Sequence, residues 1–124
     1  MGTRMIASRE SMAIEAYKQM LLASTLDDVI RTRAFSGLDS NILRPSIISA
    51  GLDPECLDEH VTPKQAAKLF GAEAMEAKRW KNIWSAGHSV SAVRQVLPVA
   101  EIVEQTRKQF HAARAASFEN ERYT

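Results

Sequence analysis

Cysteine is nearly absent from this sequence of 124 residues, which contains only Cys56. A single cysteine excludes an internal disulfide, and because this is usual in a reducing compartment we expect a cytoplasmic protein. Acidic residues precede and follow Cys56 in the sequence. Since nearby negative charge raises the pKa of a thiol, the sequence favours an inert cysteine over a reactive one.

Long apolar runs are also missing, and none approaches the roughly 20 residues that a membrane-spanning helix needs. The N-terminal residues lack the uninterrupted apolar stretch of a signal peptide. The formal net charge is only +1, so no excess of charge indicates nucleic acid or a membrane surface as a partner. His60 and His111 have no partners at metal-ligand spacing, and we therefore expect no metal site.

The composition, 45% hydrophobic and 25% charged, is typical of one soluble globular domain. Periodic apolar residues and capping signals predict a mainly α fold with one or two short strands. The first helix is capped by Ser8 or Ser11, and Pro98 begins the last. The predicted helices cover residues 8–24, 41–50, 62–86 and 98–116, and a frayed tail covers 117–124.

One strand is predicted, over 29–35, because its side chains alternate in character and Ser36-Gly37 provides a turn after it. A lone strand cannot satisfy its own backbone hydrogen-bonding groups. We therefore expect this strand to pair with a second copy of the chain, giving a homo-oligomer, or with strands outside this sequence.

Both tryptophans lie in the segment 78–90 (KRWKNIWSAGHSV). Trp80 and Trp84 are four residues apart, a spacing that places them on one face of a helix. Gly87 is a typical helix stop, and His88 after it predicts a C-terminal cap whose positive form favours the helix dipole.

Several segments of the chain, taken together and in order, resemble the nitronate monooxygenases, formerly called 2-nitropropane dioxygenases. These are FMN-dependent flavoproteins with an α/β (β/α)₈ TIM-barrel fold. The resemblance is spread over about residues 1–115. The matching segments are residues 1–5 (MGTRM), 15–19 (EAYKQ), 27–37 (DDVIRTRAFSG), 80–90 (WKNIWSAGHSV) and 96–101 (VLPVAE).

The resemblance implies where a cofactor would bind. Residues 1–7 would form the end of the last barrel strand and a phosphate-binding turn, followed by a helical C-terminal region over 8–116. Gly2 would let the backbone approach the FMN phosphate, and Thr3 would add a hydroxyl donor. Gly87, His88 and Ser89 would form the rim of the active site, although family members often carry glutamine and glycine at the last two positions.

The activity that the resemblance implies is oxidation of an alkyl nitronate, with electrons passing to FMN and then to dioxygen. The family's catalytic histidine has no counterpart here, so no catalytic residue is assigned. The chain looks like the C-terminal part of such an enzyme, and we expect it to be inactive without the barrel. Similar barrels include enoyl reductases, which leaves the substrate open.

Two alternatives come from the residues themselves. The chain is also compatible with a small helical interaction or dimerisation module that binds no flavin. Residues 62–80 resemble a helix-turn-helix DNA-binding unit, but Glu73 and Glu76 begin its second helix, where carboxylates would repel phosphates.

Overall fold

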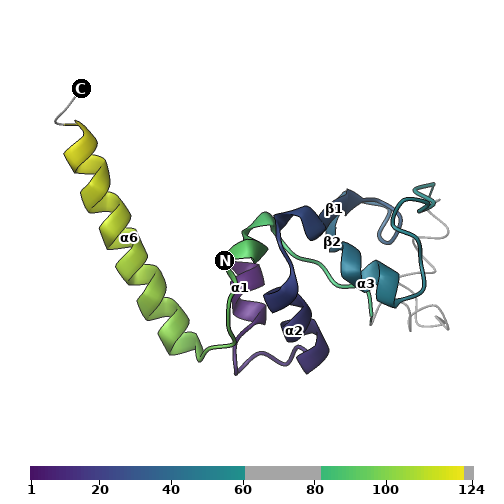
Figure 1. Cartoon of the computed structure of the whole chain (residues 1–124), viewed down its shortest axis with the longest axis horizontal. Helices are drawn as coiled ribbons and strands as arrows, with labels where there is room; N and C mark the ends of the chain where they lie inside the picture. Colours follow the sequence, from purple (N-terminus) through teal and green to yellow (C-terminus); the bar gives the residue numbers. More distant parts are fainter. Residues whose placement is uncertain (61–81, 122–124) are drawn as a thin grey trace.

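The computed structural model of the protein describes residues 1–60 and 82–121 (Figure 1). This part is mainly helical with a two-stranded antiparallel sheet, which confirms the predicted balance of helices and short strands. The predicted helix over 62–86, the helix-turn-helix segment 62–80 and Trp80 lie wholly or largely outside the described residues. The elements are α1 (Gly2–Ile6), α2 (Glu15–Ala23), η1 (Leu26–Asp28), β1 (Val29–Thr32), β2 (Ser40–Leu43), α3 (Arg44–Ser49), η2 (His88–Ala92) and α6 (Val99–Glu121).

The predicted strand over 29–35 exists as β1, but its partner lies in the same chain. β1 pairs antiparallel with β2, from Val29 opposite Leu43 to Thr32 opposite Ser40. Gly37, with a φ of 72°, lies in the connecting turn, where glycine adopts this angle without strain. Pairing of two copies through 29–35 was expected because the strand had no partner in the chain, and that reason is wrong. The pairing of two copies itself stays a prediction.

The strand β2 occupies the first part of the segment predicted as a helix over 41–50. The helix α3 begins only at Arg44, with Pro45 in its first turn. Proline is tolerated there because the first N–H groups of a helix have no internal acceptor. Gly51 follows the helix with a φ of 79°, as expected of a glycine stop.

The N-terminal residues form the short helix α1, so the prediction of a strand end over 1–7 is wrong. The amide of Met5 donates to the carbonyl of Met1 at 3.3 Å and begins the helical turn. Extended pairing begins immediately afterwards, where Ser8 forms a parallel bridge with Leu97. The chain thus forms a short helix that includes Thr3 before it becomes extended.

The helix α2 begins at Glu15, later than a cap at Ser8 or Ser11 predicts. The Ser8 hydroxyl instead accepts from the amide of Ser11 at 3.2 Å, and the Ser11 hydroxyl from that of Ala13 at 3.1 Å. These local bonds turn the chain rather than start a helix. The buried ammonium of Lys18 then holds the turn, donating to the carbonyls of Ser8 at 2.7 Å and Ser11 at 2.9 Å.

Two adjoining hydrophobic clusters form the core. The first joins α1, α2, β2 and η2, and the second joins β2, α3 and the segment before η2. Fully burying an aliphatic side chain stabilises a fold by about 1.5–3 kcal/mol, so these few contacts hold the short elements together. The first cluster contains Ala7, Leu21, Leu43, Ala86, Val90 and Val93, and the second Ile42, Ile47 and Ile83.

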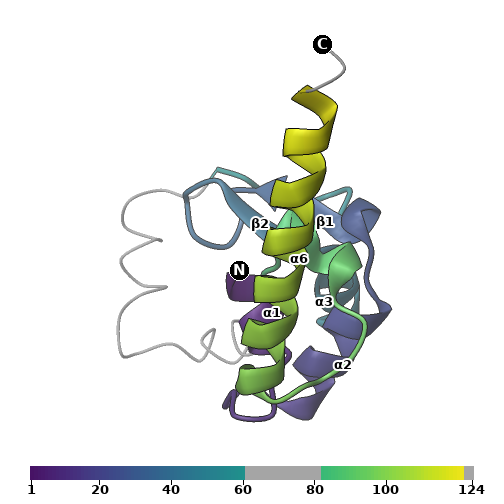
Figure 2. The ribbon, with the colours of Figure 1, turned by 90° about the vertical axis from the view of Figure 1, so that its left-hand side faces the viewer.

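The last helix, α6, begins after Pro98 as predicted, and both carboxylate oxygens of Glu10 accept from the Val99 amide at 3.0–3.1 Å. Ile102 is buried against the rest of the protein, but the helix then projects away from it (Figures 1 and 2). It continues to Glu121, past the fraying predicted from 117. None of the described helices combines the length and apolar character required to span a membrane.

Candidate functional site

The segment 83–87 leads to the predicted active-site rim and is extended rather than helical. The carbonyl of Trp84 accepts from the Leu43 amide at 2.8 Å, and the amide of Ala86 donates to the carbonyl of Asn41 at 3.3 Å. A bridge between Ser85 and Ile42 lies between these bonds. The predicted placement of Trp84 on a helix is wrong, because the outer edge of β2 pairs with this segment.

Ser46 fixes the start of the same segment. Its fully buried hydroxyl accepts from the Trp84 amide at 3.0 Å and donates to the carbonyl of Leu43 at 2.7 Å. A buried hydroxyl that both donates and accepts is fully satisfied without water. Sequence reasoning missed Ser46, since a serine in a short helix gives no signal of a contact 38 residues away.

Tyr17 supports the segment from the other side. Its hydroxyl donates to the carbonyl of Ser85 at 2.5 Å, and its ring stacks on Trp84 with centroids 5.0 Å apart and an interplanar angle of 18°. Burial raises the pKa of the Tyr17 phenol above its usual value, and the hydrogen bond to Ser85 opposes that rise. Sequence reasoning treated Tyr17 as a core residue and did not identify this contact.

The two groups of predicted site residues meet at one hydrogen bond. The Gly87 amide donates to the hydroxyl oxygen of Thr3 at 2.8 Å, across 84 positions of sequence. Thr3 is only 8% exposed, so little water competes for this bond. A Cβ on residue 87 would lie 3.3 Å from the same oxygen, and glycine therefore permits the close approach.

His88 and Ser89 begin η2 and are both exposed. Gly87 precedes this 3-10 turn with extended backbone angles, and its carbonyl accepts from the Val90 amide at 3.1 Å. The interpretation of Gly87 as a helix stop and of His88 as a C-terminal cap is therefore wrong. Both residues instead follow directly after Gly87, and the Ser89 hydroxyl oxygen lies 3.9 Å from the position of a Cβ at residue 87.

The donors around Gly2 and Thr3 suit a phosphate group. Gly2 is exposed, and apart from its chain neighbours and the backbone of α1 no atom of the described residues lies within 4 Å of a Cβ built on it, so these residues leave its backbone accessible to a ligand. The first N–H groups of a helix have no acceptor within the helix, and phosphate oxygens accept such bonds. The hydroxyl of Thr3 accepts from Gly87 and donates to none of the described residues, which leaves its proton for an acceptor such as phosphate.

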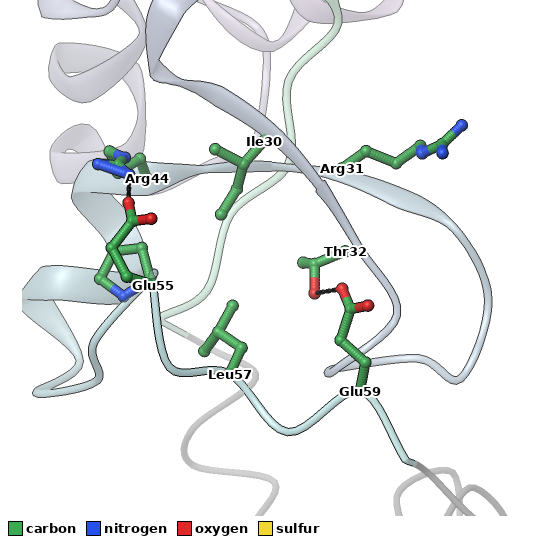
Figure 3. A pocket seen from close by; sticks show the side chains of 8 residues that line it. Ile30, Arg31, Thr32, Arg44, Glu55, Leu57 and Glu59 are labelled. Atoms are coloured by element: carbon green, nitrogen blue, oxygen red, sulfur yellow. Dashed lines mark hydrogen bonds and ion pairs between the residues drawn. The ribbon is translucent and has the colours of Figure 1, made fainter.

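A hollow of about 300 Å³ lies elsewhere, between the β-hairpin and the acidic segment 54–59 (Figure 3). Arg44 pairs with Glu55 at one side, and at the other Glu59 accepts from the hydroxyl of Thr32 at 2.8 Å. This bond and one from the Arg33 amide lower the pKa of Glu59. The hollow contains none of the predicted site residues, and within 1–60 and 82–121 no three potential ligands gather to hold a metal ion.

Comparison with known protein families identifies the family of this chain. A family model described as nitronate monooxygenase matches residues 1–108, so the chain belongs to the nitronate monooxygenase family. The family resemblance predicted from the sequence is thereby confirmed, and with it the broad class of monooxygenase-type oxidoreductases. No matching curated protein and no matching solved structure were found.

Proposed function

We propose that the chain acts in an FMN-dependent oxidation of alkyl nitronates by dioxygen, with Gly2 and Thr3 holding the phosphate of FMN. Gly87, His88 and Ser89 form the rim of the active site next to them. The observation that carries this proposal is the 2.8 Å hydrogen bond from the Gly87 amide to Thr3, which brings the two segments together.

FMN, when bound, supplies the electron-transfer chemistry, and the protein supplies binding and orientation. The backbone of Gly2 and the hydroxyl of Thr3 donate to the phosphate, while the buried position of Thr3 limits competition from water. His88 and Ser89 present exposed polar groups at the rim, where they contact a small nitronate-like substrate. We assign no catalytic base to the residues of this chain.

Flavin binding and turnover test the proposal separately. FMN is titrated into the protein and followed by its fluorescence, and oxygen uptake is then measured with an alkyl nitronate. Thr3→Val should weaken FMN binding about tenfold, because a hydrogen bond to a charged group is lost. Thr106→Val is the matched control, since among residues 1–60 and 82–121 the hydroxyl of Thr106 bonds only the Ile102 carbonyl within α6.

The expected result is saturable FMN binding by the unaltered protein and the Thr106 variant, weakened in the Thr3 variant. Binding without oxygen uptake supports the cofactor site and agrees with the inactivity expected of this chain alone, whereas oxygen uptake contradicts that inactivity. No binding of FMN to the unaltered protein contradicts the cofactor site and, with it, the proposed function.

A second candidate function, an interaction module without flavin, is favoured by α6. Beyond Ile102 the helix exposes large apolar side chains, those of Val103, Phe110 and Phe118. Val103 and Phe110 are seven positions apart and therefore share one face of α6, and exposed apolar groups gathered on one face are typical of contact surfaces. Sedimentation of the unaltered protein and of Phe110→Glu tests this: a dimer that the substitution dissociates supports the module, and a monomer contradicts it. If the dimer persists in this variant, the next contact to test is the edge of β1 that faces away from β2.

A further inference from the structure

Tyr17 touches neither Gly2 nor Thr3, yet it holds the segment that ends at Gly87. We propose that Tyr17 is a positioning residue for the phosphate site: through Ser85 and Trp84 it places the Gly87 amide on Thr3, which directs the Thr3 hydroxyl proton toward the phosphate. This inference rests on the proposed function and names the residue that prepares the site.

The first step is the attachment of the segment 84–87. The Trp84 backbone is held by Ser46 and Leu43, and the Ala86 amide by Asn41. At Ser85 the carbonyl accepts from the Tyr17 hydroxyl. Tyr17 thus supplies the side-chain bond nearest to Gly87 on the α2 side, and its stacked ring fixes the neighbouring Trp84.

The second step is the direction of the Thr3 proton. A hydroxyl has one proton to donate and two lone pairs that accept. The Gly87 amide occupies one lone pair at 2.8 Å, and the Thr3 proton must point away from that donor. No described residue accepts this proton. A phosphate oxygen approaching over the open face of Gly2 is the acceptor that the arrangement suits.

The two steps give a quantitative expectation. Tyr17→Phe retains the stacked ring and removes only the bond to Ser85, so Gly87 is held less firmly on Thr3. We expect the dissociation constant for FMN to rise about fivefold, as for one lost neutral hydrogen bond. Thr3→Val removes the hydroxyl on which Tyr17 is proposed to act. Adding Tyr17→Phe to this variant should therefore weaken FMN binding little further, because the effects of coupled residues are not additive.

The experiment compares FMN with riboflavin, which lacks the phosphate, in the unaltered protein and in Tyr17→Phe, Thr3→Val and the double variant. Ser24→Ala is the matched control, because it removes another side-chain hydrogen bond of α2, to the Met20 carbonyl at 2.7 Å. Hydrogen exchange of the Gly87 amide is measured by NMR in the same proteins without flavin.

Weaker binding of FMN but not of riboflavin in Tyr17→Phe, with the Ser24 variant unchanged, supports the proposal. Equal losses for both flavins, or a loss no larger than that of the Ser24 variant, overturn it while the proposed function stands. Failure of the unaltered protein to bind FMN overturns the proposed function. Exchange of the Gly87 amide then tests the positioning role without flavin. Unchanged exchange in Tyr17→Phe overturns that role. Faster exchange in Tyr17→Phe and in Thr3→Val, with the Ser24 variant unchanged, supports it.

Discussion

The hydroxyl oxygen of Thr3 accepts a hydrogen bond from the amide of Gly87 at 2.8 Å, although 84 positions separate the two residues. This bond joins the first helical turn of the protein to the segment that pairs with the outer edge of β2. Both ends lie in segments that resemble the same family, and the family match covers both. The bond therefore has a structural role that can be measured without any flavin.

Replacing Thr3 by valine should lower the free energy of unfolding by about 1–2 kcal/mol, because the Gly87 amide loses its acceptor in a mostly buried position. Thr3→Ser keeps the oxygen and should cost less. Urea unfolding of the two variants measures the difference. Equal stabilities would show that the hydroxyl oxygen is not what holds Gly87.

A methyl group at position 87 should be costly because of Thr3, since a Cβ there would lie 3.3 Å from the Thr3 oxygen. The backbone of Gly87 has a φ of −79°, which other residues adopt freely, so strain of the backbone is not involved. We expect Gly87→Ala to destabilise by about 1 kcal/mol through crowding. In a Thr3→Ala background the same substitution should cost less, and an undiminished cost in thermal unfolding would argue against crowding by Thr3.

Lys18 is the buried cation that holds the turn before α2. Lys18→Met keeps the apolar stem but removes the donors to the carbonyls of Ser8 and Ser11. We expect a loss of about 1.5–3 kcal/mol, as for hydrogen bonds made by a charged group. The exposed Lys108 is the control, and Lys108→Met should change stability by less than about 0.5 kcal/mol. Comparable losses at both positions would contradict the account.

The Tyr17 phenol makes stability depend on pH on the alkaline side. Burial raises its pKa in the folded protein above the ordinary value of 10.0, so folding favours the protonated form. This contribution is complete below the unfolded pKa and is lost as the pH rises through the folded pKa. The stability difference between the unaltered protein and Tyr17→Phe, followed by urea unfolding, should shrink above about pH 10. A constant difference would contradict this.

Glu59 should produce the opposite dependence in acid. Bonds from the Thr32 hydroxyl and the Arg33 amide lower its pKa, so its contribution is present above the unfolded pKa and is lost as the pH falls through the folded one. Glu59→Gln should flatten the acid side of the stability profile, measured by thermal unfolding between about pH 3 and 6. An unchanged slope would show that Glu59 does not titrate in this way.

Local signals predicted the parts of the fold that depend on nearby residues. Gly37 and Gly51 have the positive φ angles expected of a turn and a helix stop, and α6 follows Pro98. Tertiary pairing overrode such signals elsewhere. Residues 41–43 form β2 instead of a helix, and Trp84 is extended because β2 pairs with its segment.

The candidate site was predictable only in part. Family resemblance singled out Thr3 and Gly87 separately, but their hydrogen bond depends on how distant segments pack. Tyr17 and Ser46 resemble ordinary core residues in the sequence. Their support of Trp84 and Ser85 exists only once α2 and α3 are packed beside that segment.

Retention of flavin through gel filtration tests the central claim most directly. The protein is incubated with FMN, separated from free flavin, and examined by its visible absorbance beside the Thr3→Val and Thr106→Val variants. We predict flavin absorbance that elutes with the unaltered protein and the Thr106 variant and is reduced in the Thr3 variant. A folded but colourless protein in all three samples would contradict a cofactor site at Gly2 and Thr3.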